Sequence, residues 1–275
     1  MKRVTIVGFG LIGGSLALAL RRGGQVHVTA IDRAPVLARP EARTAADAHV
    51  ALEDSEALRV ALEQADVTVL AVPVGTIIRL LPWSLTHARV VTDCGSTKRE
   101  IAHTAREHPR GSCFVPGHPM AGLPDGGIEN ARGDLFEGRS WILSPGHSDP
   151  SAFAAITELL ALTGAQLVEL SPEAHDRAVA VTIHLPQLLA SSLFTLLDET
   201  TARVAMGPAF ERATRAAGGP ESMWSDIFET NADEVARAAE ALSQELAQVA
   251  QGLRRSPPDT QAALAVLARA RSRRS

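Results

Sequence analysis

The sequence predicts an α/β protein with a Rossmann-like parallel-sheet domain followed by an all-helical dimerisation domain. Three observations lead to this fold class. Short apolar strands alternate with helical segments through the first two thirds of the chain, a glycine-rich loop follows the first strand, and only helical patterns follow Ser171-Pro172. We therefore expect two domains, residues 1–170 and residues 171–275.

The composition allows a large core and argues against nucleic acid as a partner. Of the 275 residues, 45% are hydrophobic, and the formal net charge is −4. A slightly acidic chain offers little attraction for a phosphate backbone, so we expect no nucleic-acid partner. The basic residues at 254–255 and 269–274 are expected to form a frayed, solvated end.

Cysteine usage and the N-terminus indicate a cytoplasmic protein. The two cysteines, Cys94 and Cys113, form no CxxC pair and are too few for a disulfide framework. The apolar run at residues 4–7 is far too short for a signal peptide or a membrane span. We expect no membrane partner and no metal site.

The first domain is expected to contain a parallel sheet, because its strands are continuously apolar and are separated by helices. The expected strands are residues 4–7, 26–31, 67–72, 89–92, 112–115, 141–143 and 166–170. The expected helices between them include residues 15–22, 58–64 and 151–162.

The second domain is expected to begin with a helix, since Ser171 is a suitable N-cap and Pro172 a suitable first helical residue. Further on, apolar residues follow an alternating four-three spacing that predicts a helix of roughly five turns. This apolar stripe consists of Val235, Ala239, Leu242, Leu246, Val249 and Leu253. An all-helical domain this small can bury such a stripe against a second copy, so we expect a homodimer.

The loop Gly8-Phe9-Gly10-Leu11-Ile12-Gly13 has the GxGxxG pattern of a dinucleotide site, and it lies between a strand and a helix. Gly8 permits the tight turn, Gly10 lets the backbone approach the pyrophosphate, and Gly13 lets the helix pack closely on the strand. The helix N-terminus favours the anion. The expected cofactor-binding residues are Gly8, Gly10, Leu11, Ile12, Gly13 and Asp32.

Asp32 ends the second strand, where a carboxylate can accept hydrogen bonds from the ribose hydroxyls. The same carboxylate would repel a 2′-phosphate, so NAD is the expected cofactor and NADP the less favoured one. Arg33 keeps NADP open, because an arginine there can hold that phosphate.

Polar segments follow two later strands, at residues 93–98 and 117–122. Ligands of open α/β sheets bind at the carboxyl ends of the strands, so both segments are candidates for a substrate site. A third set lies in the helical half and consists of Glu173, His175, Asp176, residues 184–187, Thr214, Arg215, Met223 and Trp224.

Together these segments resemble the prephenate and arogenate dehydrogenase family of tyrosine biosynthesis, over most of the chain. The matching motifs are GFGLIGGS at residues 8–15, DxxSxK at 93–98, GHPMAG at 117–122, a DLFxGRxW-like stretch at 134–141, HLP at 184–186 and FxxxTR at 210–215. The resemblance implies oxidative decarboxylation of a cyclohexadienol acid, prephenate or arogenate, with hydride transfer to NAD.

The resemblance implies two catalytic residues. His118 is the candidate base for the ring hydroxyl, and an imidazole with a pKa near about 6.5 suits that role. The alternative is a histidine bonded within a tight His-Pro turn. Ser96 would orient the same hydroxyl, and its alternative or additional role is to cap the helix that follows it.

The implied substrate-binding residues are His184, Gln187 and Arg215. A guanidinium can bind a carboxylate through two hydrogen bonds, which suits Arg215, although a surface ion pair is its alternative. His184 could equally be a core histidine bonded to a carbonyl. His175 and Asp176 are open between helix capping and function. Trp224 is expected in the core or the pocket wall.

Four positions depart from the family pattern. Gln187 replaces a second histidine of HLPH, which leaves open whether the substrate carries a ketone or an amine. Ile183 replaces a serine, Pro124 a glutamate, and Arg212 an acidic residue. The last two changes suggest a differently built pocket entrance and leave room for 4-amino-4-deoxyprephenate, a substrate of secondary metabolism.

Two other interpretations stay open. A 3-hydroxyacid dehydrogenase or imine reductase shares GxGxxG but gives no reason for GHPMAG and FxxxTR. A non-catalytic dinucleotide-sensing protein would bind NAD without turning over a cyclohexadienyl acid. The chain leaves no residues for a fused chorismate mutase or ACT domain, so feedback by tyrosine is expected only at the active site.

Overall fold

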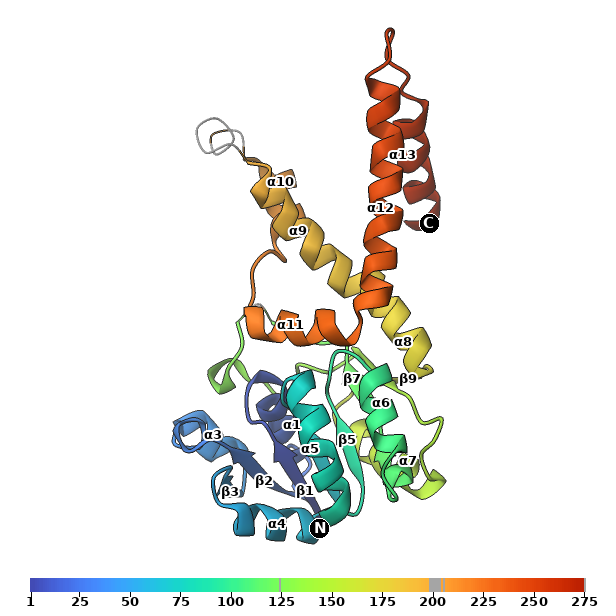
Figure 1. Ribbon diagram of the computed structural model, residues 1–275. Helices are drawn as coiled ribbons and strands as arrows, with labels where there is room; N and C mark the ends of the chain where they lie inside the picture. The colour runs from blue at the N-terminus through green and yellow to red at the C-terminus, as the bar shows by residue number, and fades with distance from the viewer. Residues whose placement is uncertain (124, 198–203, 205, 275) are drawn as a thin grey trace.

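The computed structural model describes residues 1–123, 125–197, 204 and 206–274, and Figure 1 shows its two-part architecture. The strands are β1 (Lys2–Val7), β2 (Val26–Asp32), β3 (Ala48–Ala51), β4 (Val67–Leu70), β5 (Val91–Asp93), β6 (Phe114–Val115), β7 (Gly117–Pro119), β8 (Ser140–Leu143) and β9 (Gln166–Glu169). The helices around them are α1 (Leu11–Arg21), α2 (Ala34–Leu37), α3 (Pro40–Ala45), α4 (Ser55–Gln64), α5 (Val74–His87), α6 (Arg99–Arg106) and α7 (Pro150–Ala161).

The first six strands form one parallel sheet in the order β3-β2-β1-β4-β5-β6. The order reverses between β1 and β4, which is the doubly wound arrangement of a Rossmann-like domain. The predicted fold class is therefore confirmed for this half. The glycine-rich loop follows β1, next to the point where the strand order changes.

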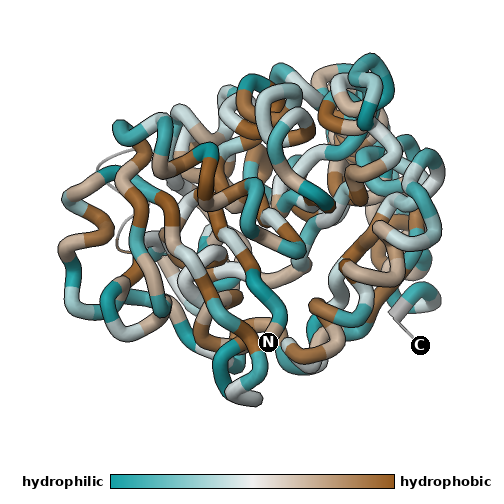
Figure 2. Tube along the Cα trace, turned by 90° about the horizontal axis from the view of Figure 1, so that it is seen from below, coloured by the Kyte–Doolittle hydropathy of each residue, from teal (hydrophilic) through white to brown (hydrophobic). Residues whose placement is uncertain are grey.

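Hydrophobic cores lie on both faces of this sheet, because successive side chains of each strand point to opposite faces. Val4 and Ile6 of β1 pack in one core with residues of α1 and α7. Val7 of β1 and Leu70 of β4 pack in the other, with residues of α4, α5 and α6. Figure 2 shows hydrophobic stretches of the chain alternating with hydrophilic ones.

The last predicted strands do not complete the parallel sheet, so that expectation is wrong. β8 and β9 form a separate sheet with β7, in the order β7-β8-β9, and β7 runs antiparallel to β8. Hydrophobic periodicity identifies a strand but not its partner, which is why the sequence could not separate the two sheets. The sequence also missed β3, a short edge strand whose residues are partly exposed.

From Ser171 onward the described chain is helical. Its helices are α8 (Pro172–Val179), a π-helical turn at Ala180–His184, α9 (Leu185–Thr195), α10 (Pro208–Thr214), α11 (Glu221–Thr230), α12 (Ala232–Leu253) and α13 (Gln261–Arg274). Ser171 caps α8 as predicted, since its hydroxyl accepts a hydrogen bond from the backbone N–H of Ala174 at 3.1 Å. Pro186 has no N–H and crowds the preceding turn, and the π turn accommodates it.

The predicted long helix is α12, and α13 packs alongside it (Figure 1). The expectation of a frayed end is wrong for residues 269–274, because they lie in α13, where Arg269 pairs with Glu245 of α12. Arg254 and Arg255 follow the end of α12, and the basic residues at 254–255 and 269–273 are exposed, as expected. The apolar stripe of α12 is only partly covered within one chain. Val235 is buried, whereas Leu246 is 54% exposed and Leu253 is 47% exposed.

One helical stretch, Pro172–Thr195, is long and apolar enough to cross a membrane by length and composition. Only 28% of its most apolar portion is buried within the chain. Three of its polar side chains, His175, Asp176 and His184, are nevertheless fully buried.

Two carboxylates of the helical half cap helices of the sheet domain. Asp226 of α11 accepts a hydrogen bond from the backbone N–H of Gly75, in the first turn of α5, at 2.9 Å. Asp176 of α8 accepts from the N–H groups of Lys98 and Arg99, at the start of α6, at 2.7 and 2.9 Å. Helix N-termini favour negative charge, so both contacts hold the helical half against the carboxyl edge of the sheet.

Candidate active site

Each glycine of the loop is required or tolerated for a different structural reason. Gly8 has φ +94°, and a Cβ there would lie 2.5 Å from the carbonyl oxygen of Ala71. A Cβ on Gly13 would overlap the carbonyl oxygen of Gly8. A Cβ on Gly10 would stand in open space. Gly8 and Gly13 are therefore required by the fold, whereas the space beside Gly10 suits the close approach of a ligand.

The loop presents an anion site at the start of α1. Gly10 is the N-cap residue and supplies no side-chain cap. The first N–H groups of a helix have no intrahelical acceptor, and here they belong to Leu11, Ile12 and Gly13. This arrangement of open space and free N–H groups fits a pyrophosphate.

Asp32 is held in position at the end of β2. Its carboxylate accepts hydrogen bonds from the backbone N–H of Phe9 at 2.6 Å and of Arg33 at 2.7 Å. The first of these bonds ties the carboxylate to the glycine-rich loop itself. Asp32 therefore lies directly beside the glycine-rich loop, and Arg33 next to it is exposed.

His118 lies on β7 and is buried, with 8% of its surface exposed. Its Nδ1 lies 2.8 Å from Nε2 of His175. Burial, and after it the nearby His175, Lys98 and His184, hold the pKa of His118 well below its usual value. The side chain is therefore neutral at physiological pH, which a base requires.

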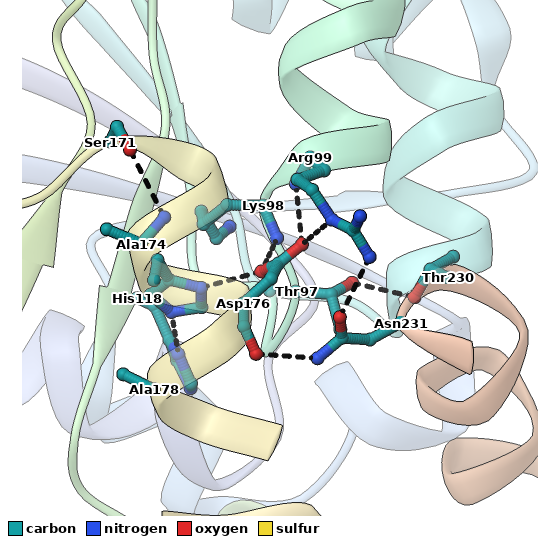
Figure 3. A network of polar contacts seen from close by, with 12 residues as sticks. Thr97, Lys98, Arg99, His118, Ser171, Ala174, Asp176, Ala178, Thr230 and Asn231 are labelled. Carbon is teal, nitrogen blue, oxygen red and sulfur yellow. Dashed lines mark hydrogen bonds and ion pairs between the residues drawn. The ribbon is translucent and has the colours of Figure 1, made fainter. Parts of the chain in front are cut away.

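His175 and Asp176 extend this contact toward α6. Figure 3 shows Asp176 beside Lys98 and Arg99. His175 Nδ1 lies 2.8 Å from Oδ1 of Asp176. Burial lowers the pKa of His175. Burial alone would raise the pKa of Asp176, but hydrogen bonds from His175 and from the N–H groups of Arg99 and Lys98 outweigh it, so the pKa of Asp176 is lowered. Neither residue caps its own helix, whose cap is Ser171. Asp176 instead caps α6, and His175 contacts the candidate base.

Lys98 and Asp93 form a buried pair that the sequence analysis did not single out. The Lys98 ammonium donates a hydrogen bond to Asp93, and both side chains are 0% exposed. Asp93 also accepts from the N–H groups of Gly95 and Gly117, at 2.8 and 2.9 Å. It thereby ties the loop after β5 to the residue that precedes His118. The available signal was the pair of opposite charges at the two ends of DxxSxK.

Ser96 is half-buried in this same loop. It does not cap α6, which begins at Arg99 with Lys98 as its N-cap residue and no side-chain cap from within the loop. Asp176 supplies that cap from the helical half instead. The hydroxyl of Ser96 is thus not needed for capping.

His184 ends the π turn and is fully buried. Its Nδ1 lies 3.3 Å from Nδ2 of Asn231, and its Nε2 is buried without a hydrogen-bond partner in the described part of the chain. Burial lowers the pKa of His184 to about 4. The expected alternative, a carbonyl partner, is not what the structure has. Trp224 meets the ring edge-on at 6.2 Å, as a pocket wall would.

Gln187 and Arg215 lie in the same region of the helical half but differ in burial. Gln187 is 9% exposed, and its amide nitrogen donates to the carbonyl oxygen of Gly218. Arg215 follows α10 and is exposed, and it has no ion pair within the described residues. The structure of one chain therefore brings His118, His175 and His184 together but leaves Arg215 outside that cluster.

The stretch at residues 134–139 has a structural role. Asp134 pairs with Arg132 at 2.6 Å, and Phe136 packs against Trp141 at 4.9 Å between ring centres. The N–H of Arg132 donates to the hydroxyl of Ser15 on α1 at 2.9 Å. This segment supports α1 and β8 rather than the chemistry.

Three of the four departures from the family pattern fall on described positions, and Gln187 has been placed above. Ile183 is half-buried beside His184, and Arg212 is exposed on α10. Pro124 lies outside the described residues. A cavity of about 380 Å³ opens between α6 and the start of α8, but His118 is not among the residues that line it.

Two family models match the chain over most of its length. The model described as "Prephenate dehydrogenase, nucleotide-binding domain" matches residues 16–169. The model described as "Prephenate dehydrogenase, dimerization domain" matches residues 171–265.

Individual proteins are similar over the same range. A prephenate dehydrogenase from Bacillus subtilis is 32% identical over 245 residues, which cover 84% of this chain and 65% of the relative. The chain thus spans less than two thirds of that relative's length. A probable prephenate dehydrogenase, NovF, from Streptomyces niveus is 34% identical over 92% of this chain and 69% of its own.

A solved structure shares the whole fold. Prephenate dehydrogenase from A. aeolicus, in complex with hydroxyphenyl propionate and NAD+, superposes with a TM-score of 0.82 at 26% identity. The match covers 100% of this chain and 97% of that one. The similarity therefore includes the arrangement of the two halves as well as each half alone.

Proposed function

Because the chain belongs to the prephenate dehydrogenase family, we propose that it oxidatively decarboxylates a cyclohexadienol acid, prephenate or arogenate, with NAD as hydride acceptor. The observation that carries this proposal is His118. It is a buried, neutral imidazole whose Nδ1 is held by His175, in a motif at the carboxyl edge of the sheet. That edge also carries the glycine-rich loop.

Gly8, Gly10, Leu11, Ile12, Gly13 and Asp32 are the proposed cofactor site. The space beside Gly10 and the free N–H groups of α1 suit a pyrophosphate, and Asp32 suits an unphosphorylated ribose. When bound, NAD supplies the acceptor for the hydride that leaves the carbinol carbon of the ring. A carboxylate at Asp32 favours NAD over NADP.

His118 is the proposed base. It accepts the proton of the ring hydroxyl as the carbinol carbon is oxidised, and the C–C bond to the ring carboxylate then breaks and releases CO₂. The electron pair of that bond completes the aromatic ring, and the oxygen takes back its proton from His118 to leave a phenol. His118 therefore accepts a proton in the first step and returns it in the last, so it ends each turnover neutral.

Ser96, His184, Gln187 and Arg215 are proposed to bind the substrate. Ser96 has a hydroxyl that is not used for capping, and the buried Nε2 of His184 lacks a partner among the described residues. Gln187 is buried one helical turn from His184. Arg215 is exposed, and a guanidinium at the mouth of a site suits the capture of a carboxylate.

The proposed assembly is a homodimer of chains with domains at residues 1–170 and 171–275. The match to a dimerization domain and the exposed leucines of α12 support a second copy as the partner. The buried polar residues of Pro172–Thr195 support a role for this stretch within the protein instead of in a membrane. A cytoplasmic location and the absence of a nucleic-acid partner complete the proposal.

The decisive experiment measures NADH formation with prephenate, arogenate and 4-amino-4-deoxyprephenate side by side. Turnover of prephenate or arogenate is the expected result, and Gln187 in place of a histidine makes the relative rates informative. A preference for the 4-amino compound would instead indicate a role in secondary metabolism. NAD binding without turnover of any of the three would overturn the proposal in favour of a dinucleotide sensor.

A further inference from the structure

Two buried histidines each have one ring nitrogen in contact with a neighbour of known hydrogen-bonding character. Nδ1 of His118 contacts Nε2 of His175, and Nδ1 of His184 contacts Nδ2 of Asn231. A neutral imidazole carries one proton, so the partner of one nitrogen decides whether the other donates or accepts. Each of the two chains of contacts leads to a group that can only donate or only accept a hydrogen bond.

The chain of contacts that ends on His118 begins at Asp176. Its carboxylate accepts from the N–H groups of Lys98 and Arg99, so it is ionised and acts only as an acceptor. His175 must therefore donate to it from Nδ1, which leaves a lone pair on its own Nε2. Nδ1 of His118 then carries a proton and donates to His175, and Nε2 of His118 is left as an acceptor.

The chain of contacts that ends on His184 begins at Arg99, which only donates. Arg99 donates to Oδ1 of Asn231 at 3.0 Å, and this contact fixes the orientation of the amide. Nδ2 of Asn231 then donates to the carbonyl oxygen of Asp176 at 2.8 Å and to Nδ1 of His184 at 3.3 Å. His184 therefore carries its proton on Nε2, the nitrogen that is buried without a partner among the described residues.

We propose that Arg99, Asp176, His175 and Asn231 form a positioning network that sets opposite tautomers on two active-site histidines. His118 presents an acceptor to the ring hydroxyl, and His184 presents a donor to an oxygen of the anionic substrate. This inference rests on the proposed function for the identity of the substrate, but the tautomers themselves do not depend on it. His184 lies close enough to His118 that a positive charge on His184 would lower the pKa of His118.

The same network links the site to the docking of the two halves. Asp176 and Asn231 come from the helical half, whereas Lys98 and Arg99 begin α6 of the sheet domain (Figure 3). Arg99 also pairs with Asp233 of α12, which anchors its guanidinium. His118 and His184 therefore have these tautomers only when the helical half is docked on the sheet domain.

The direct test is ¹⁵N NMR of the full-length protein with labelled histidine, with His118→Asn and His184→Asn used to assign the signals. The expected spectra place the proton of His118 on Nδ1 and that of His184 on Nε2. The reverse assignment for either ring would overturn the inference. This outcome is separable from failure of the proposed function, because the tautomers are measured without substrate and do not depend on turnover of any cyclohexadienyl acid.

Two variants test the cause. His175→Phe removes the acceptor for His118, so we expect a mixture of His118 tautomers and a fall in kcat of at least ~10-fold with little change in NAD affinity. His175→Gln offers an amide oxygen in its place and is expected to recover part of the loss. Exposed His103, on α6, provides the matched control His103→Phe, which should change neither tautomer nor kcat.

Asn231→Asp tests the other arm with almost no change of shape. A carboxylate at this position still accepts from Arg99 but cannot donate to His184, so His184 is expected to move its proton to Nδ1 and KM for the substrate to rise. Melting temperatures measured for each variant separate this effect from loss of the fold. A folded His175→Phe with wild-type kcat, or a folded Asn231→Asp with the wild-type His184 tautomer, would overturn the inference.

Discussion

Asp176 of the helical half caps a helix of the sheet domain by accepting the backbone N–H of Arg99 at 2.9 Å. The two residues are 77 positions apart in the chain. The contact therefore joins folding of the second half to the geometry of the first.

The second cap of this kind provides a test that avoids the active site. Asp226→Ala removes the acceptor of the Gly75 N–H in α5. We expect the free energy of unfolding to fall by ~0.5–2 kcal/mol, because the start of α5 loses its acceptor. Urea denaturation measures this change, with Glu240→Ala on the exposed face of α12 as the control. Equal stability of the two variants would show that the Asp226 contact is not stabilising.

The glycine-rich loop offers a pair of matched substitutions. Gly10→Ala places a methyl group in open space, so stability should be unchanged while NAD affinity falls. Gly13→Ala places one against the Gly8 carbonyl and should lower the melting temperature. Fluorescence titration with NADH and thermal melts separate the two effects. Unchanged NAD affinity in Gly10→Ala would place the pyrophosphate elsewhere.

The local structure around the glycine-rich loop, a strand followed by a tight loop and a helix, was predicted from the sequence and is confirmed. Strand, loop and helix are adjacent in the chain, so local pattern is enough to place Gly8, Gly13 and Asp32. The contact between His175 and His118 joins residues 57 positions apart, and no local pattern reports it. The same limit hid the separate sheet of β7, β8 and β9, since a strand's own sequence does not name its partner.

His118→Asn tests the proposed base. An amide cannot take the hydroxyl proton, so kcat should fall by ~10²–10⁴-fold while NADH affinity stays at the wild-type level. Steady-state kinetics with the preferred substrate and a fluorescence titration measure the two quantities. Wild-type turnover in this variant would remove His118 from the mechanism.

The pH profile depends on the protonation of His118. Its pKa lies well below the usual value, so the base stays neutral as the pH falls through the range in which an ordinary histidine titrates. We expect kcat/KM to stay level from about pH 8 down to about pH 6.5, and to fall only when the pH approaches the lowered pKa. Measurements in buffers of constant ionic strength test this. A half-maximal rate near about pH 6.5 would mean that His118 titrates normally.

The exposed leucines of α12 give a prediction on assembly. Leu246→Glu together with Leu253→Glu places charges on the uncovered stripe, and we expect the dimer to dissociate. Sedimentation equilibrium reports the mass. Gln248→Glu, on the same helix but outside the stripe, is the control for added charge. A double variant that keeps the wild-type mass would locate the dimer contact on other helices.

The π turn before Pro186 fixes how the side chains of α8 and α9 are oriented relative to each other along the continuous helical stretch Pro172–Thr195. An α-helix turns by about 100° per residue, so the additional residue held in this turn sets the angle between the side chains of α8 and those of α9. His175 and Asp176 therefore face the sheet while Gln187 faces the carbonyl of Gly218. Removing a single residue between them would restore a regular helix and rotate one set of side chains away from its partners. The spacing between His175 and Gln187 is in this sense as much a functional element as either side chain.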